Sequence, residues 1–179
     1  MGAPFQPFSR APQIRYRYKT GDIQITGAAL WQSQYLSQGP EGKSQKYIKN
    51  SCVPEIYAGI DYKHKGLLIG AGIEMVSLTP RTQATVEDKI YKVSERITSL
   101  SYEVHMKYNS EKWLVAAKSV LGSNLTQTSM LGGYGIKSID PRTGEQEYSP
   151  NRNSSSWINI VYGKTWKPAI FFGYMKNLG

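Results

Sequence analysis

Apolar and polar side chains alternate along eight segments of this chain, and the connections between the segments are short and long in turn. The short connections are residues 20–22, 64–66, 110–111 and 166–167. The long connections lie near residues 34–53, 79–93 and 123–155. Alternation with a period of two predicts strands that have one face in an apolar medium and one in water. Tight turns at one rim and long loops at the other are typical of transmembrane β-barrels.

The alternation predicts an all-β fold, an antiparallel meander of about eight strands. The predicted strands are residues 14–18, 22–34, 55–63, 67–75, 100–108, 113–121, 156–164 and 169–176. The fifth has the clearest pattern, because Val104 and Met106 alternate with Glu103, His105 and Lys107. The last two are apolar on both faces, so their alternation is weaker. The long connections carry turn residues such as Pro141 and Gly144, which indicates loops and not helices.

Length and composition agree with this fold. A chain of 179 residues is one domain by size, 1–179, which could close a small eight-stranded barrel or supply part of a larger one. Charged residues make up 20% of the chain, and it has no apolar run long enough for a membrane helix. Residues 1–8 lack the features of a secretory signal. We therefore expect an exported protein whose signal is absent from this chain, which we interpret as an internal fragment.

Alternation with a period of two does not determine which face of the sheet points into the barrel. In a soluble lipocalin-like barrel that carries a small apolar ligand, apolar side chains point inward, whereas in a membrane barrel they face lipid. Three features favour lipid. Ions of both signs share the polar face of one strand, and small residues recur where a barrel core needs large ones. Aromatic residues also stand near strand ends, as in an interfacial girdle: Trp31, Tyr62, Tyr108 and Trp113. The carrier remains the alternative.

With the polar face inside, ten ionisable residues become candidate pore-lining residues. They are Arg15, Arg17, Glu55, Asp61, Lys63, Glu74, Glu103, His105, Lys107 and Lys118. Apart from the histidine, five are basic and four acidic, so the lumen field is weak and only a mild anion preference follows. Nucleic-acid binding, suggested by the net charge of +9, is disfavoured because the basic residues are spread over every loop and no recognition motif occurs.

No constellation of catalytic residues is present in the sequence. His64 is expected in a turn and His105 on the polar face of a strand, and neither has a carboxylate at a distinctive spacing. The single Cys52 excludes an internal disulfide and fits neither a metal site nor a redox pair. We therefore expect no enzymatic activity, no cofactor and no metal.

Several motifs resemble those of Bacteroidota outer-membrane porins of the DcaP-like trimeric group. They are Pro4 to Arg10 followed by Pro12 to Arg15, Leu68 to Ile73 followed by Leu78 to Arg81, Met130 to Gly135, and Phe172 to Gly179. The resemblance covers nearly the whole chain. It implies a barrel with more strands than eight, usually trimeric, which passes small hydrophilic solutes across the bacterial outer membrane and contacts its lipid.

The same resemblance gives the longest connection a role. In porins, one such loop folds into the lumen and sets its constriction. The glycine-rich segment of residues 126–139 suits this position, and its candidate constriction residues are Leu131, Gly132, Gly133 and Tyr134. A phosphate-binding loop is a poor alternative, because this segment contains no Gly-Lys-Ser or Gly-Lys-Thr sequence and no helix is signalled after the glycines; Ile136 separates Gly135 from Lys137 and Ser138.

Overall fold

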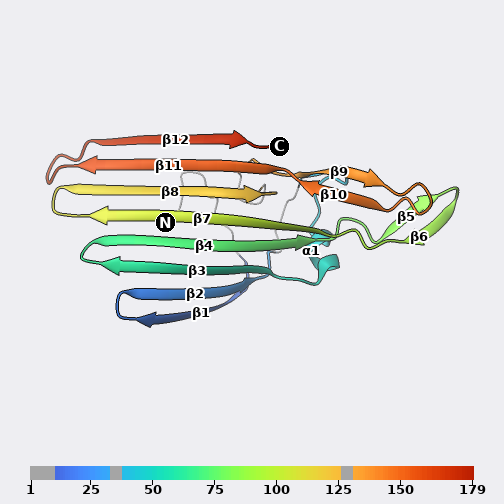
Figure 1. Cartoon of the computed structure of the whole chain (residues 1–179), viewed down its shortest axis with the longest axis horizontal. Coiled ribbons are helices and arrows are strands. Elements are labelled where there is room, and N and C mark those ends of the chain that lie inside the picture. The colour runs from blue at the N-terminus through green and yellow to red at the C-terminus, as the bar shows by residue number, and fades with distance from the viewer. Residues whose placement is uncertain (1–10, 33–37, 126–130) are drawn as a thin grey trace.

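The structure, a computed structural model, describes residues 11–32, 38–125 and 131–179. Its main element is a single antiparallel sheet of eight strands, each hydrogen-bonded to the next along the order β1-β2-β3-β4-β7-β8-β11-β12 (Figure 1). The strands are β1 (Gln13–Thr20), β2 (Ile23–Leu30), β3 (Glu55–His64), β4 (Leu67–Leu78), β7 (Ile97–Asn109), β8 (Trp113–Ser123), β11 (Arg152–Tyr162) and β12 (Ala169–Asn177). The predicted eight-stranded antiparallel meander is confirmed.

Short turns join the strands at one end of the sheet. Between β3 and β4, Lys65 and Gly66 have φ of 41° and 85°, and positive φ at both positions is the requirement of a tight two-residue hairpin whose twist matches that of its strands. A Cβ on Gly66 would overlap the carbonyl oxygen of Asn109, so this turn packs closely against the end of β7. The alternating short and long connections therefore separate a tight-turn rim from a long-connection rim (Figure 1).

The long connections contain secondary structure that the sequence did not reveal. Helix α1 (Lys46–Ser51) lies in the first. A hairpin of β5 (Gln83–Val86) and β6 (Lys89–Lys92) lies in the second, and one of β9 (Tyr134–Ile139) and β10 (Gln146–Pro150) in the third. The prediction of loops without helices was wrong for the first connection. A helix of six residues shows too little periodicity to be recognised, and it forms because Tyr47, Ile48 and Ser51 are buried together.

Strand boundaries also differ from the predicted ones. The strand predicted over 22–34 ends at Leu30, where the Trp31 N–H donates to the carbonyl oxygen of Pro12. Conversely, β4 and β7 are each three residues longer than predicted at the long-connection rim. Strand β4 ends at Leu78, and β7 begins at Ile97. The side chains of these extensions pack against the long connections, so the extensions do not show the alternation of apolar and polar residues by which the strands were recognised. Residues 33 and 34 lie outside the described part of the chain.

Both clusters of buried apolar side chains lie at the long-connection rim, where the ends of β4 and β7 meet the long connections. One cluster joins Tyr47 and Ile48 of α1 to Val76 and Leu78 of β4. Another joins Ile97 to Tyr134 and Tyr148, whose rings meet edge to face with centroids 5.2 Å apart. The eight strands therefore form a single layer, with large apolar side chains left exposed on it.

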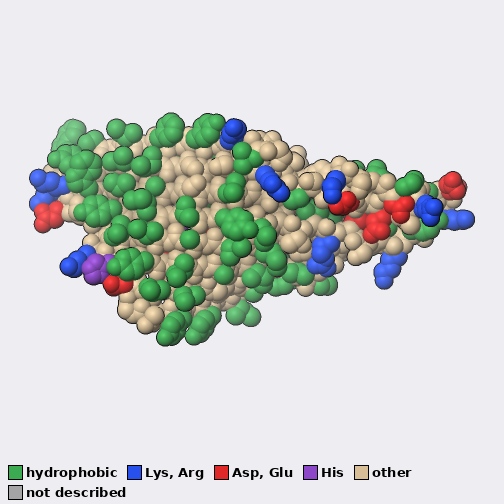
Figure 2. Space-filling model, viewed as in Figure 1, with side chains coloured by type: hydrophobic (Ala, Val, Ile, Leu, Met, Phe, Trp, Pro, Cys, Tyr) green, Lys and Arg blue, Asp and Glu red, His purple; other side chains and the backbone are tan. Residues whose placement is uncertain are grey.

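Strand register sorts the side chains onto two faces of opposite character. One row of directly opposed residues crosses all eight strands and is mostly apolar: Tyr18, Ile25, Ile60, Ala71, Val104, Ser119, Ser156 and Tyr174. Its two serine hydroxyls hydrogen-bond to each other at 2.8 Å. Figure 2 shows apolar side chains spread over the sheet on this face, with charged groups at the tight-turn rim, near the C-terminal end of β12 and on the hairpins. No helix in the described ranges is long and apolar enough to cross a membrane.

Candidate functional site

The opposite face of the sheet, here called the polar face, carries the candidate site. One residue along from the apolar row, register aligns Lys19, Gln24, Asp61, Gly70, His105, Lys118, Trp157 and Gly173. The other seven candidates lie in neighbouring rows of the same face. Each is paired directly with a residue of the polar face on the adjacent strand, which places it on that face: Arg15, Arg17, Glu55, Lys63, Glu74, Glu103 and Lys107. All ten predicted lining residues thus share one face of the sheet.

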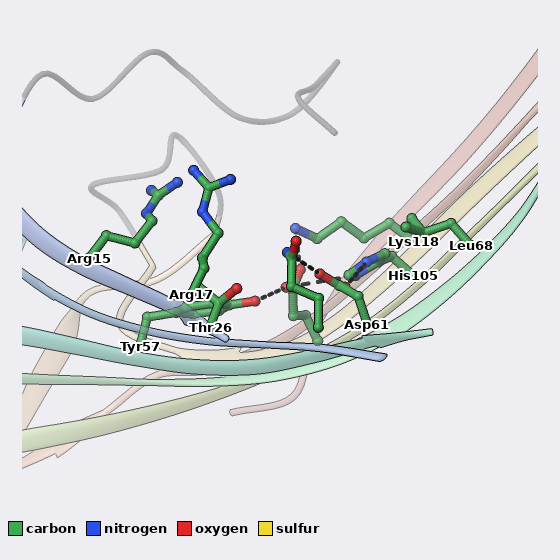
Figure 3. Close-up of a pocket in the computed structure, with 10 residues that line it drawn as sticks. Arg15, Arg17, Thr26, Tyr57, Asp61, Leu68, His105 and Lys118 are labelled. Carbon is green, nitrogen blue, oxygen red and sulfur yellow. Dashed lines mark hydrogen bonds and ion pairs between the residues drawn. The ribbon is translucent and has the colours of Figure 1, made fainter. Parts of the chain in front are cut away.

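Six of these ten line a depression of about 550 Å³ on the polar face. They are Arg15, Arg17, Asp61, Glu103, His105 and Lys118 (Figure 3). The sheet curves toward these side chains, so the polar face is its concave side (Figure 3). Four further residues of the depression were not singled out from the sequence, namely Gln24, Thr26, Tyr57 and Leu68. Tyr57 is the most informative omission, because an aromatic residue on a polar face carries no charge pattern to mark it.

Two hydrogen bonds cross the depression by passing over glycines of β4. Asp61 Oδ1 on β3 lies 3.0 Å from His105 Nε2 on β7, above Gly70. The Tyr57 hydroxyl donates to Glu103 Oε1 at 2.9 Å, above Gly72. A Cβ on either glycine would overlap the polar side chains that lie over it. The missing side chains on β4 therefore allow residues two strands apart to meet.

The carboxylates of the depression are paired with basic groups. Lys118 Nζ forms an ion pair with Glu103, and His105 Nδ1 lies 3.8 Å from the same carboxylate. Gln24 Nε2 donates to Asp61 at 3.4 Å. The four ionisable side chains of this network are between 12% and 25% exposed, so solvent reaches them only in part. The network holds acids and bases in fixed positions on β3, β7 and β8.

The β1 side of the depression is purely basic. Arg15 donates from Nη2 to the Gln13 side chain at 2.8 Å, a neutral partner. Neither Arg15 nor Arg17 forms an ion pair with any residue in the described ranges. Both guanidinium groups project from β1 above the sheet (Figure 3). Positive charge without a counterion therefore faces a network whose carboxylates are already paired.

Both histidines have carboxylate partners, contrary to the expectation from sequence spacing. His64 Nδ1 lies 2.7 Å from Asp22 at the tight-turn rim, where both side chains are about half exposed. His105 contacts Asp61, as described above. The partners are 42 and 44 residues apart in the chain, since strand pairing and not local spacing brings them together. His105 lies on the polar face of β7 as predicted, whereas His64 is the last residue of β3, next to the turn at Lys65 and Gly66 and not in it.

The candidate constriction segment lies at the long-connection rim. Tyr134 starts β9 and is only 4% exposed, packed against Tyr148. The Leu131 carbonyl oxygen accepts a hydrogen bond from Asn153 Nδ2, and the Gly133 carbonyl accepts one from the Asn151 N–H at 2.9 Å. Asn153 is a polar-face residue of β11, opposed to Gly122. These bonds tie Leu131, Gly132, Gly133 and Tyr134 to the rim of the polar face, and their constriction role stays a prediction.

No group of three or more His, Cys, Asp or Glu side chains within residues 11–32, 38–125 and 131–179 could hold a metal ion. Cys52 is exposed and ends α1 in the left-handed conformation, with φ of 53°.

One comparison with known proteins bears on the fold. No protein-family model and no curated protein sequence matches this chain. Among solved structures, it is similar to the outer membrane channel DcaP of Acinetobacter baumannii, with a TM-score of 0.63 and 13% sequence identity. The match covers 98% of this chain and spans about half, 50%, of the channel's chain. At this identity the likeness establishes an outer-membrane-channel fold, and it gives no support to a specifically Bacteroidota group. Residues 4–10 and Met130, which contributed to that resemblance, lie outside the described residues.

Proposed function

We propose that this chain forms the wall of an outer-membrane pore, or part of one, for passive diffusion of small hydrophilic solutes. The observation that carries the proposal is the curvature of the sheet relative to its two faces. The ionic residues lie on the concave side, which a closed barrel would turn toward its lumen, and the apolar row lies on the other. A carrier of apolar ligands needs the reverse arrangement.

Exposure of the side chains supports the same orientation. Val104 is 57% and Ile60 is 50% exposed, and the described part of the chain places no second layer over them. Adjacent residues on β7 that face the other way, Glu103 and His105, have side chains 17% and 14% exposed. In water such an apolar face is a liability. In a bilayer it is the surface that contacts lipid tails.

Aromatic residues mark the tight-turn rim of the apolar face. Tyr62, Tyr108 and Trp113 stand at or next to strand ends there, and Tyr162 packs on Trp113 with ring centroids 4.6 Å apart. Trp31 follows β2 at the opposite rim. Aromatic rings are favoured at the level of lipid headgroups because they are apolar with a polar edge. This placement supports a membrane boundary near each end of the strands.

The lumen would select weakly for anions. Because Glu103 and Asp61 already have basic partners, Arg15 and Arg17 contribute the uncompensated charge on this side of the depression. Charge rings of this kind bias permeation without a specific binding site. We infer no catalysis, cofactor or nucleic-acid partner, and we propose a homotrimer for the complete pore, with the segment Leu131 to Tyr134 narrowing its mouth.

Labelling along β7 tests the orientation. Cysteine is introduced singly from Tyr102 to Lys107 in a Cys52→Ser background, and a spin label at each position reports contact with oxygen, which is soluble in lipid, or with a water-soluble nickel complex. In lipid vesicles, positions 102, 104 and 106 should respond to oxygen, and positions 103, 105 and 107 to nickel. If the first set is protected from both reagents, the apolar face is a closed core and the carrier is favoured.

Ion selectivity tests the pore. In planar bilayers with a salt gradient, Arg15→Glu combined with Arg17→Glu should move the reversal potential toward cation preference. The control is Lys89→Glu with Lys92→Glu, which makes the same change in net charge on the β5–β6 hairpin, away from the polar face. Equal shifts in the two double variants would show that Arg15 and Arg17 do not line the conduction path.

A further inference from the structure

His105 occupies the centre of the charge network on the polar face. Its strand, β7, lies between β4 and β8 in the middle of the eight-stranded sheet. The ring reaches Asp61 on β3 through Nε2 at 3.0 Å and approaches Glu103 through Nδ1 at 3.8 Å. Both ring nitrogens therefore face carboxylate oxygens. The Nε2 contact is of hydrogen-bond length, and the Nδ1 contact is a longer electrostatic approach.

Every element near the ring contributes to its electrostatic environment. On β7 itself Glu103 and Lys107 share its face, and β8 presents Lys118 directly opposite. On β3, Asp61 and the Tyr57 hydroxyl line the depression, and Lys63 and Glu55 are the further titratable groups on the same face. On β4 the residue beneath the ring is the uncharged Gly70, and β2 presents Gln24. Arg15 and Arg17 on β1 line the same depression.

The charges lining the depression nearly cancel, so one proton matters. Arg15, Arg17 and Lys118 contribute three positive charges, and Asp61 and Glu103 contribute two negative charges, which leaves one positive charge when the imidazole is neutral. Protonation of the imidazole doubles this to two. Histidine is the residue type that ordinarily changes charge between about pH 8 and pH 5. Other ionic side chains of the depression are carboxylates, lysine and arginine, which titrate mainly outside that interval.

We propose that His105 is a specificity-determining residue of the lumen, whose proton sets how strongly the pore prefers anions. This inference rests on the proposed function, since it concerns ions that pass the polar face. A unit charge about 7 Å from an ion in water changes the ion's energy by about RT. Anions would be enriched and cations depleted by similar factors. Allowing for screening by salt, the anion-to-cation permeability ratio rises about two- to sevenfold on protonation.

The test compares reversal potentials at pH 8 and pH 5 in planar bilayers under a potassium chloride gradient. The native protein should show the rise in anion preference on acidification. His105→Gln keeps a side-chain N–H donor toward Asp61 but stays uncharged at both pH values, so most of the rise should disappear. His105→Lys keeps a positive charge at both pH values, so its ratio at pH 8 should approach the native ratio at pH 5.

The matched control is His64→Gln. His64 also pairs with a carboxylate, Asp22, but at the tight-turn rim and outside the depression, so this variant should retain the full pH response. Circular dichroism and a conductance of native size verify that each variant is folded. Conducting channels with no pH response, or a full response in His105→Gln, would overturn the role of His105 while leaving the pore intact. Absence of conductance at both pH values would overturn both proposals.

Discussion

Replacing Glu95 with glutamine should loosen the long-connection rim selectively. Glu95 is 2% exposed and lies between β6 and β7. Its Oε1 accepts from Arg81 Nη2 and the Gln146 N–H, both at 2.7 Å. Its Oε2 accepts from Arg81 Nε at 3.0 Å and the Tyr148 hydroxyl at 2.8 Å. Arg81 also donates to the Gly144 carbonyl at 2.7 Å, so one carboxylate holds both hairpins together.

The magnitude follows from these four bonds. Glutamine offers one acceptor oxygen, so its NH₂ group would face two of the four donors. Two lost hydrogen bonds to a charged group cost about 1.5–3 kcal/mol each. Removing one partner of a buried ion pair costs about 3–5 kcal/mol, in agreement with that sum. Burial and the bond to Glu95 also raise the pKa of Tyr148, so this hydroxyl stays a donor to the carboxylate.

Hydrogen exchange of backbone amides in detergent micelles is the assay. A loss of about 3–5 kcal/mol lowers protection of the β5–β6 and β9–β10 amides by about two to four powers of ten, while the central strands β4 and β7 stay protected near the tight-turn rim. The control, Glu147→Gln, removes an exposed partner of Lys137 on the same hairpins and should change nothing measurable. Unchanged protection in Glu95→Gln would refute the role of this carboxylate as the clamp.

Three further predictions concern the faces and the turns. Val104→Arg places a charge in the middle of the apolar row and should lower the free energy of unfolding in lipid vesicles by about 2–4 kcal/mol. The control, Val120→Arg, lies opposite Glu103 on the polar face and should lower it far less. Equal losses in urea titrations of the two variants would contradict the assigned faces. Gly70→Ala should lower the free energy of unfolding by about 1–3 kcal/mol, because the added methyl group pushes Asp61 and His105 apart. Gly27→Ala is the control and should leave stability unchanged, since a Cβ there meets nothing within 4 Å. A stable Gly70→Ala protein with an unchanged His105 ring signal in NMR spectra would argue against the hydrogen bond between Asp61 and His105 over β4. The Arg142 N–H and the Thr143 hydroxyl lower the pKa of Asp140, so this carboxylate stabilises its turn above the unfolded pKa of about 3.9 and loses that effect as the pH falls through the lowered value. The protection of the Arg142 amide, expressed relative to its intrinsic exchange rate at each pH, should therefore fall in acid, and Asp140→Asn should abolish that dependence.

Alternation alone was enough to predict the sheet and its two faces. A side-chain period of two admits one assignment of each residue to a face once the strand is recognised. For this reason the ten candidate lining residues fall on one face of the structure, including Arg15 at one edge and Lys118 five strands away on β8. The tight turns were equally readable, since Gly66 is required by local backbone geometry.

Contacts between distant strands could not be read from the sequence. The bond between His105 and Asp61 depends on β4 lying between their strands and presenting Gly70 at that level. Helix α1 and the β9–β10 hairpin were missed because their formation depends on burial against β4 and β7, not on a local repeat.

The sequence by itself determined the strand pattern, the turns and the segregation of charge from apolar surface, because these depend on neighbours along the chain. The tertiary structure decided which face is concave, which carboxylates are paired and where the core lies. Those properties arise from strand order, register and curvature, which join residues some forty or more positions apart.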